Sequence, residues 1–576
     1  MASGDRGRVC SSSVTERRRS RTYPAWGYQT SPVLKTGWAT GPVPLRGEAS
    51  TAFTPGRPRR PVVRSAGEMS IETASATESD VQARFDELQR KLVPQWKLIE
   101  RFTPAPRGIV VLPSLSGVSL PLDTTKQSAY EERFLFLLFL LRQPRAHLVF
   151  VTSVPVQPTL IDYYLGLLPG VVASHARERL HLVSPNDGSV RPLSAKLLER
   201  PRLLEHIRAL AGDPDIAHIV PFNVTTLERD LALRLGLPIY GADPKFAPFG
   251  TKSGSRALFA EAGVAHPAGR DELRSTDDIV DAVRELVAAR PEAEHFVLKH
   301  DEGVSGIGNA VLDVRGLQGA SRGAVADRLR EVRPEAGSVD AYLEGFASGG
   351  IVEEMITGTE LQSPSVQMRA TPVGGVQLLS THDQLLGGAS GQTFMGSVFP
   401  ASGEYAKEIA AEALKVGELL AGRGVLGRFA VDFLTAREND RWHPYAIELN
   451  LRKGGTTHPY LTLQFLTEGG YDADHALFFT RNGDPKFFVS TDRLESEAYR
   501  VFQPDDVFDV AVRGGLHFDH AAQTGVVFHM LTSLSQHGLI GLTAVSNSPE
   551  EAKRLFADTR DTFDREAAAA AQPSPL

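Results

Sequence analysis

Two carboxylates, one amide and one guanidinium stand within a short stretch of the chain, at Asp432, Glu448, Asn450 and Arg452. Hard cations such as Mg²⁺ take a few carboxylate oxygens from a protein and leave the remaining positions to water and nucleotide phosphates. Three oxygen ligands and a guanidinium in otherwise apolar sequence therefore suggest a site for Mg²⁺ and a phosphorylated ligand. The alternative is that the carboxylates lie on a solvated face.

A β-hairpin is the element expected to bring these four side chains together. Apolar, β-rich runs over 428–436 and 442–451 flank a polar turn at 438–440, a pattern typical of two paired strands. Side chains alternate along a strand, so positions of even number share one face. The two carboxylates and the amide would then point the same way, with the arginine just beyond them.

A second stretch, 295–314, combines a lysine with a glycine-rich loop. An expected strand delivers Lys299, a loop follows with Gly303, Gly306 and Gly308, and a second expected strand leaves the loop. Glycine lets backbone N–H groups approach a phosphate closely, and lysine supplies a point charge. The pattern differs from the P-loop, in which a GK[ST] motif opens a helix. The alternative is a flexible hairpin tip.

Two weaker motifs flank this loop along the chain. Lys252 stands in an expected loop just before a short helix. An apolar strand within 349–368 runs into Glu353-Glu354-Met355-Ile356, and Glu360 follows after a glycine turn. Backbone at a strand end beside an apolar pocket suits an adenine ring, and a later carboxylate can accept hydrogen bonds from ribose hydroxyls. Taken singly, such glutamates are more often surface charges.

The elements around these motifs predict an α/β and α+β protein of several domains. Strands are expected at 107–117, 146–156, 179–185 and 217–223, with helices between them, which indicates a parallel α/β layer. Further helices are expected at 404–421, with one apolar stripe, at 458–466 and from about 548. The sequence predicts a disordered tail at 1–78, three domains at 79–243, 244–484 and 485–565, and a second disordered tail at 566–576.

Composition narrows the classes of function. The chain of 576 residues can hold three or four domains. Its longest apolar run, 134–141, is far shorter than a membrane span and is expected to form a buried helix. Cys10 is the only cysteine, which excludes disulfides and thiolate chemistry from the folded body and fits a cytoplasmic location. His517, His520 and His529 are interpreted as structural or substrate-facing, because no HExxH motif accompanies them.

Charge is distributed unevenly along the chain. Residues 1–68 carry twelve Arg or Lys against four Asp or Glu, a net charge of +8. The whole chain has a net charge of −7, so residues 69–576 have a net charge of −15. An acidic body argues against a nucleic-acid partner. The basic, Ser- and Pro-rich start is expected to be disordered. A transit peptide and a translation start at Met69 are the alternatives for this segment.

Taken in order, the motifs resemble the ATP-grasp superfamily over about residues 244–470. The resemblance implies one group of residues that contacts ATP: Lys252, Lys299, Gly303, Ser305, Gly306, Gly308, Glu353, Glu354, Met355, Ile356 and Glu360. It implies a second group that holds one or two Mg²⁺, with Mn²⁺ as a substitute: Asp432, Glu448 and Asn450. Arg452 and Lys299 become the candidate catalytic residues, with the arginine beside the reacting carboxylate.

Three further stretches look like the pheganomycin-type peptide ligases, which are carboxylate–amine ligases. They are ELNLRKGGTTHP at 448–459, the earlier LGLPIYG, and GLIGLTAVSNSPEEA at 538–552. This resemblance implies a pre-ATP-grasp α/β domain, then an ATP-grasp domain of two α+β subdomains that grip ATP, and a small C-terminal α/β domain.

The resemblance implies an enzyme that forms an amide bond through an acylphosphate and releases ADP and phosphate. The acid and the amine would be amino acids or peptides, with no membrane or nucleic-acid partner. Which acid and which amine, and the oligomeric state, with a homodimer among the options, stay open. The alternatives are a kinase- or carboxylase-like enzyme that makes no amide, and a degenerate nucleotide-binding scaffold. A dehydrogenase is excluded because no G-x-G-x-x-G opens a helix after the first strand.

Overall fold

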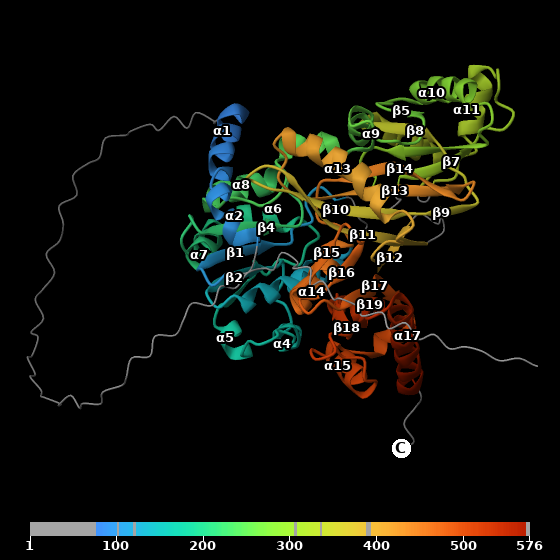
Figure 1. Cartoon of the computed structure of the whole chain (residues 1–576). Helices are drawn as coiled ribbons and strands as arrows, with labels where there is room; N and C mark the ends of the chain where they lie inside the picture. The colour runs from blue at the N-terminus through green and yellow to red at the C-terminus, as the bar shows by residue number, and fades with distance from the viewer. Residues whose placement is uncertain are drawn as a thin grey trace, which may run out of the picture. The chain divides into compact units, whose positions relative to one another are not determined.

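The computed structural model describes residues 77–571 apart from 101–102, 119–121, 304–307, 335–336 and 388–392. All of them belong to the unit of the chain that begins at Ser75 (Figure 1). Residues 1–76 of the expected N-terminal tail and the middle of the glycine-rich loop therefore lie outside the described residues, together with 572–576.

The first part of this unit folds around a parallel sheet with the strand order β3-β2-β1-β4. The strands are β1 (Arg107–Leu112), β2 (Ala146–Val151), β3 (Leu180–Val183) and β4 (Ala217–Pro221). Every residue of β1 and β4 is buried, as happens where helices cover both faces of a parallel sheet. The surrounding helices are α1 (Glu78–Gln89), α2 (Leu92–Glu100), α3 (Thr124–Glu132), α4 (Pro158–Gly166), α5 (Ala173–Arg177), α6 (Leu193–Leu198), α7 (Pro201–Ala211) and α8 (Thr226–Leu235). The predicted parallel α/β layer is confirmed.

The apolar run 134–141 lies in η1 (Arg133–Arg142), a 3₁₀ helix that continues directly from α3. Leu135, Leu138 and Phe139 are completely buried in it. η1 packs against β2, α4 and α14 (Thr457–Thr467), so it has apolar neighbours on several sides. A helix that is apolar all round belongs in a protein core, which confirms the buried helix predicted for this run.

The next part of the chain begins with η2 (Pro244–Gly250) and α9 (Lys252–Glu261) and forms an antiparallel sheet with the strand order β5-β8-β6-β7. Its strands are β5 (Gly269–Arg270), β6 (His295–His300), β7 (Asn309–Asp313) and β8 (Gly350–Glu354). Helices pack on it through a core that includes Ile279, Phe296 and Val352. These helices are α10 (Thr276–Ala289), α11 (Arg322–Leu329), α12 (Val339–Glu344) and the 3₁₀ helix η3 (Gly345–Ser348).

A larger sheet follows, with the strand path β14-β13-β10-β11-β12-β17-β16-β15. Its first strands are β9 (Glu360–Gln362), β10 (Pro364–Ala370), β11 (Val376–Gly387), β12 (Thr393–Phe399), β13 (Gly427–Glu438) and β14 (Arg441–Asn450). Helix α13 (Ala406–Gly422) packs on β10 and β11. The residues of its expected apolar stripe are buried, which confirms that stripe: Tyr405, Ile409, Ala413, Val416 and Leu420. The helix expected at 458–466 is α14.

The C-terminal part extends the same sheet. β17 (Pro485–Glu495) pairs antiparallel with β12, so the chain after residue 485 is joined edge to edge to the sheet before it. The remaining elements are β15 (Gly470–Asp472), β16 (Leu477–Phe479), η4 (Glu497–Val501), α15 (Pro504–Arg513), β18 (Gly525–His529), η5 (Leu531–Ser533), α16 (Leu534–His537), β19 (Leu539–Ser546) and α17 (Pro549–Ala570). Because α17 continues to Ala570, the expected boundary of the last disordered tail at residue 566 is too early.

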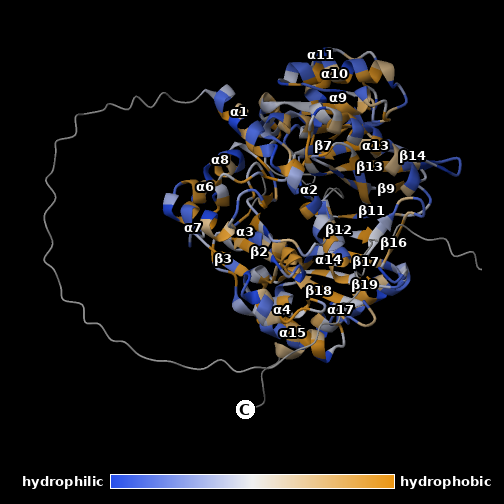
Figure 2. Cartoon of the chain, turned by 60° about the vertical axis from the view of Figure 1, so that its left-hand side comes forward, coloured by the Kyte–Doolittle hydropathy of each residue, from blue (hydrophilic) through white to orange (hydrophobic). Residues whose placement is uncertain are grey.

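Hydropathy follows this layering. In Figure 2, helices such as α10 and α11 carry both polar and apolar stretches, as expected for helices that cover one face of a sheet. Among the described helices, none combines the length and the apolar character needed to cross a membrane.

Candidate active site

The predicted hairpin forms from β13 and β14. Its turn consists of Asn439 and Asp440, which both have positive φ angles of 49° and 60°. Two-residue turns of this kind match the twist of the flanking strands, and Asn and Asp tolerate positive φ better than most residues. The alternating strands and their polar turn were therefore readable from the sequence, and the hairpin is confirmed.

The hairpin register brings the expected magnesium ligands together. Asp432 lies directly opposite Glu448, and Asn450 lies opposite Ala430. The Asn450 Nδ2 atom donates a hydrogen bond to Asp432 Oδ2 at 2.9 Å. A register shift follows Asp432, since Phe433 pairs with Ala446. The expected shared face therefore exists at this end of the hairpin.

Two carboxylates so placed repel each other. Burial and the negative charge of Glu448 raise the pKa of Asp432 to about 6, while Ser365, Arg452 and Lys252 act in the opposite direction. A cation between two carboxylates relieves such repulsion, and the neighbouring Asn450 offers a further oxygen. The group therefore has the composition and the electrostatics of a site for Mg²⁺.

Lys252 connects this hairpin to the glycine-rich loop. Its Nζ atom lies 2.7 Å from Glu448 Oε1 and donates a hydrogen bond to the Gly303 carbonyl at 3.1 Å. Contrary to the expected loop position, Lys252 is the first residue of α9, with Thr251 as the N-cap. The Thr251 side chain accepts a hydrogen bond from the Gly254 N–H, which explains why the helix begins at Lys252.

A hydrogen bond fixes α9 against the hairpin. The Leu449 N–H donates to Ser255 Oγ at 3.1 Å, one residue beyond Glu448. At the start of the helix, the Ser253 N–H donates to the Asp301 carboxylate at 2.8 Å. The helix is thus held between β14 and the loop that follows Lys299. Asp301 and Ser255 were missed by the sequence reading, because single Ser and Asp residues carry no signal of such long-range contacts.

Lys299 is held by a buried carboxylate. Its Nζ atom makes a short ion pair with Glu353 Oε1, and Arg256 Nη1 lies 3.2 Å from the other oxygen of the same carboxylate. Glu353 is 3% exposed, and Val297, two residues before Lys299, pairs with it across β6 and β8. The structure therefore directs the Glu353 side chain toward Lys299, whereas the sequence reading had it among the residues that grip adenine.

The other expected adenine and ribose residues lie near the end of β8 and beyond. Glu354 accepts a hydrogen bond from the Ala268 N–H at 2.8 Å, and the Met355 side chain is 41% exposed. Ile356 is half-buried. Glu360 is exposed and pairs with Arg437 at 3.2 Å. These positions form an accessible strip, and the structure does not bring Glu360 to the Mg²⁺ group.

The glycine-rich loop is described only at its two ends. Gly303 accepts the hydrogen bond from Lys252, and Gly308 has a positive φ of 95°. The Gly308 carbonyl accepts a hydrogen bond from the His300 N–H at 3.1 Å, which closes the base of the β6–β7 hairpin. Ser305 and Gly306 lie outside the described residues.

Arg452 leaves the end of β14 beside the carboxylates. Its guanidinium lies over the Phe222 ring, 5.8 Å from the ring centroid, and burial lowers its pKa while Glu448 and Asp432 raise it. The next residue, Lys453, is buried, and burial followed by the charge of Arg428 lowers its pKa to about 7. Lys453 Nζ donates to the Pro221 carbonyl at 2.5 Å, so the loop of Arg452 is tied to the end of β4.

Known families match the chain in the order of these parts. The Pre ATP-grasp domain matches residues 139–237, and the IQCH-like ATP-grasp domain matches 246–334 and 337–474. The PGM1 C-terminal domain matches residues 506–559. Each match falls within one of the three domains expected from the sequence.

Two curated proteins are similar over most of the chain. L-propargylglycine–L-glutamate ligase of Streptantibioticus cattleyicolor is 31% identical over 436 residues, which are 73% of this chain and 86% of that protein. IQ motif-containing protein H of Danio rerio is 24% identical over 542 residues, 84% of this chain and 50% of that protein. Among solved structures, the alignment with Campylobacter jejuni biotin carboxylase covers 82% of this chain and 96% of that chain at 12% identity, with a TM-score of 0.49.

The identity to the ligase extends over most of both chains, and the three domain matches agree with it. The chain therefore belongs to the ATP-grasp family of carboxylate–amine ligases, within the pheganomycin-type branch that joins a pre-ATP-grasp domain, an ATP-grasp domain and a PGM1 C-terminal domain.

Proposed function

We propose that this enzyme joins the carboxylate of one amino acid or peptide to the amine of another, with ATP activating the carboxylate as an acylphosphate. The observation that carries the proposal is the pair Asp432 and Glu448, which lies against Lys252 at the base of the glycine-rich loop. The similar ligase of S. cattleyicolor bears the names of two amino acids, which supports substrates of this class.

Two bond exchanges make up the proposed reaction. A carboxylate oxygen of the first substrate attacks the γ-phosphorus of ATP, and the bond from that phosphorus to ADP breaks. The amine nitrogen of the second substrate then attacks the acyl carbon and loses a proton, and the bond from that carbon to phosphate breaks. Positioning and charge neutralisation carry the first exchange, so the protein needs little covalent chemistry of its own.

Asp432, Glu448 and Asn450 are the proposed ligands of Mg²⁺, because each offers an oxygen and because the two carboxylates repel each other without a counter-charge. When bound, the ion supplies positive charge against the ATP phosphates. Lys252 already contacts Glu448 and adds a second positive charge at the same place.

Lys299 is the proposed contact to the phosphates, with Glu353 as the residue that positions it. A lysine on a flexible stem loses side-chain entropy when it meets a ligand. The carboxylate of Glu353, itself held by Arg256, keeps the Lys299 ammonium in one place before ATP arrives. Met355, Ile356 and the backbone beside them remain the proposed adenine contacts, and Glu360 the proposed ribose contact.

Arg452 is the proposed contact to the reacting carboxylate. A guanidinium offers five N–H donors in a planar fork that matches a carboxylate and can stabilise the oxyanion formed during amine attack. Only a long hydrogen bond of 3.4 Å, from Nη1 to the Lys453 carbonyl, is recorded for this guanidinium. The N–H donors that this bond does not use are the proposed contacts to the substrate carboxylate.

Hydroxylamine trapping tests the proposal directly. The full chain is incubated with ATP, Mg²⁺, pooled amino acids and hydroxylamine, and both ADP and hydroxamate are measured. We expect both products, and we expect Glu448→Ala to reduce them by about 100-fold or more, the scale of losing several kcal/mol of charge stabilisation. Glu438→Ala, an exposed glutamate at the end of β13, is the matched control and should keep full turnover.

The products separate the alternatives. ADP without hydroxamate in every amino-acid pool would point to a kinase-like phosphoryl transfer. Neither product, combined with thermal stabilisation by ATP and Mg²⁺, would point to a nucleotide-binding scaffold. Division of a productive pool into single compounds then identifies the acid, and replacement of hydroxylamine by single amino acids identifies the amine.

A further inference from the structure

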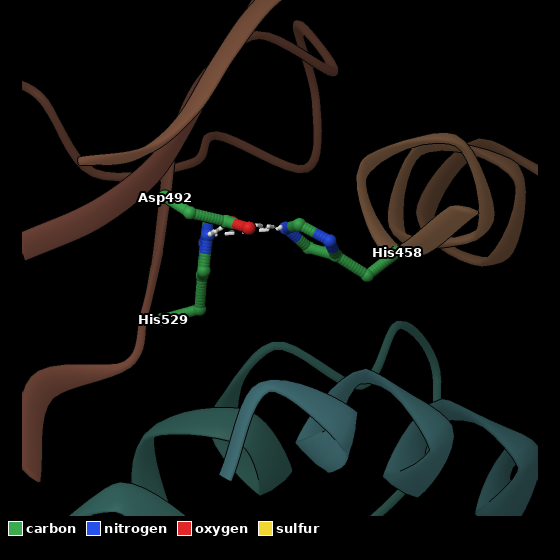
Figure 3. A group of neighbouring side chains, drawn as sticks. All are labelled: His458, Asp492 and His529. Carbon is green, nitrogen blue, oxygen red and sulfur yellow. Dashed lines mark hydrogen bonds and ion pairs between the residues drawn. The ribbon is translucent and has the colours of Figure 1, made fainter. Parts of the chain in front are cut away.

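Three side chains from distant parts of the sequence converge in the interior, at a place separate from the hairpin carboxylates. They are His458 at the start of α14, Asp492 in β17 and His529 at the end of β18 (Figure 3). His529 Nε2 lies 2.9 Å from Asp492 Oδ1 and 3.0 Å from His458 Nε2. His458 Nε2 lies 3.5 Å from the same carboxylate oxygen.

The three side chains are buried, and a neighbouring residue fixes the orientation of the carboxylate. The exposed fractions are 5% for His458, 7% for Asp492 and 3% for His529. Arg133 of η1 contacts the second oxygen of Asp492 at 2.5 Å, which orients the carboxylate so that Oδ1 faces both imidazoles. Outer partners of this kind, which fix the direction of a ligand atom, are characteristic of metal sites.

Hydrogen bonding alone serves the three atoms poorly. A neutral imidazole carries a proton on one nitrogen only, and an ionised carboxylate only accepts. Each Nε2–H proton points at one acceptor, so the contact between the two imidazole Nε2 atoms and their two contacts to Asp492 Oδ1 cannot all be good hydrogen bonds.

A cation accepts electron pairs from all three atoms at once. Ligand atoms around a tetrahedral ion with bonds of about 2.0–2.1 Å lie about 3.3 Å apart, and around an octahedral ion about 3.0 Å apart. The observed separations of 2.9, 3.0 and 3.5 Å fall around these values. The three ligand atoms all lie within 4.8 Å of one another.

We propose that His458, Asp492 and His529 bind a divalent transition cation, with Zn²⁺ as the expected ion, separately from the Mg²⁺ proposed at Asp432 and Glu448. Two imidazoles and one carboxylate suit Zn²⁺ and its first-row neighbours, whereas Mg²⁺ prefers oxygen ligands alone. Three protein ligands leave at least one position for water or a substrate oxygen. Because Arg133 already balances the charge of Asp492, an anionic oxygen in that position would be favoured.

The site has a clear structural consequence. It would hold the start of α14 against β17 and β18, and α14 follows directly after the loop that carries Arg452. The ion would therefore stabilise the wall of the candidate active site rather than contact ATP.

Sequence spacing does not reveal this group. The ligands come from three separate elements, and the HExxH spacing used to judge the histidines applies only to two ligands on one helix. His517 and His520, considered together with His529 in the sequence, belong to the segment before β18 and are not members of the group. The proposed ligands are therefore recognised by their arrangement in space and not by a local sequence motif.

Metal content of the purified full chain is the first measurement. The protein is produced in medium with Zn²⁺, Fe²⁺, Mn²⁺ and Co²⁺, purified without a metal-affinity column, and analysed by mass spectrometry of the elements. We expect about one transition-metal ion per chain, with less than about a tenth of that in His458→Ala and His529→Ala. His475→Ala is the matched control and should keep the full content, because His475 is an exposed histidine whose Nδ1 lies 2.8 Å from Asp472.

A second measurement covers the case in which these variants fail to fold. The wild-type chain is treated with a chelator and then titrated with Zn²⁺ or Co²⁺ alone, without ATP. We expect the unfolding midpoint to rise by at least about 2 °C and excess Mg²⁺ not to replace the effect. Wild-type protein that carries no transition metal and does not respond to Zn²⁺ or Co²⁺ would overturn the proposal. Neither readout depends on ligase activity.

Discussion

Lys252 Nζ lies 2.7 Å from Glu448 Oε1, and this ion pair joins the first residue of α9 to β14, the second strand of the hairpin. The same ammonium donates to the Gly303 carbonyl at 3.1 Å. One side chain therefore contacts both the proposed Mg²⁺ group and the base of the loop proposed to cover ATP. A ligand that binds between Glu448 and Gly303 must replace these two contacts of Lys252 with contacts of its own.

Lys252→Gln should weaken ATP binding more than it weakens folding. Loss of the ammonium leaves Glu448 without its partner and removes one positive charge from the phosphates. We expect kcat/KM for ATP to fall by about 10- to 100-fold, the effect of one charge-assisted hydrogen bond. Lys407→Gln, on the exposed side of α13, is the control. Equal kinetics for both variants would contradict the assignment.

Glu353→Ala should be strongly destabilising. Lys299 and Arg256 share this buried carboxylate, and its removal leaves two buried cations without their common counter-charge. Breaking a buried ion pair by removal of one partner costs about 3–5 kcal/mol. Urea denaturation followed by circular dichroism measures the loss, and Glu360→Ala, an exposed position, should cost less than about 1 kcal/mol. A cost for Glu353→Ala as small as for Glu360→Ala would argue against this role.

Arg452→Lys should not restore what Arg452→Met loses. The proposed contact uses the planar fork of the guanidinium, which an ammonium lacks. We expect both variants to lower kcat for amide formation by about 100-fold or more, the scale measured for single oxyanion donors. Full activity in Arg452→Lys would mean that charge alone is needed. Hydroxamate formation and ADP release, measured together, show which of the two chemical steps is affected.

Stability should fall with rising pH because of Glu132. This carboxylate at the end of α3 accepts hydrogen bonds from the Leu531 and Thr532 N–H groups at 2.7 and 3.0 Å, yet burial raises its pKa to about 7. Its ordinary pKa is 4.5, so the folded state keeps the proton while the unfolded state loses it. The stabilising contribution is complete below pH 4.5 and is lost as the pH rises through about 7.

Glu132→Gln tests this linkage, since the amide does not titrate. The difference in unfolding free energy between wild type and Glu132→Gln should change by about 3 kcal/mol from pH 4.5 to 7.5, to the disadvantage of the wild type. The other titrating groups contribute to both proteins and cancel in the difference. Two parallel stability curves over this range would show that Glu132 titrates normally.

Removal of divalent cations should abolish ADP formation without unfolding the chain. Mg²⁺ and Mn²⁺ are expected to restore turnover, and ATP should raise the unfolding midpoint only when one of them is present. A nucleotide at 100 times its Kd stabilises by about 2.7 kcal/mol, which is readily measured by thermal unfolding. Turnover in the presence of a strong chelator would rule out the proposed Mg²⁺ group.

Local patterns predicted the elements that depend on neighbours in sequence. Alternation and the Asn439-Asp440 turn define the hairpin, and the helical stripe from Tyr405 to Leu420 defines the face of α13. The predicted loop position of Lys252 is wrong because the Thr251 side chain caps α9 one residue earlier and so includes the lysine in the helix. Capping is a local interaction, so that error was avoidable.

Long-range contacts were beyond local patterns. The ion pairs of Glu353 depend on the pairing of β6 with β8 and on the packing of α9, and the convergence of His458, Asp492 and His529 depends on three elements. Neither arrangement leaves a spacing in the sequence. The site was predictable from the order of the motifs along the chain, because each motif alone has an ordinary structural explanation.

The pairing of β12 with β17 determines how the protein can be cut for study. Phe399 pairs with Phe488 and Ser397 with Ser490, so the strand after residue 485 covers the backbone of β12. A fragment that ends before β17 would expose a row of unpaired N–H and C=O groups, the usual template for edge-to-edge aggregation. Expression of the catalytic part alone should therefore yield insoluble protein unless the C-terminal strands are supplied with it, in the same chain or as a second one.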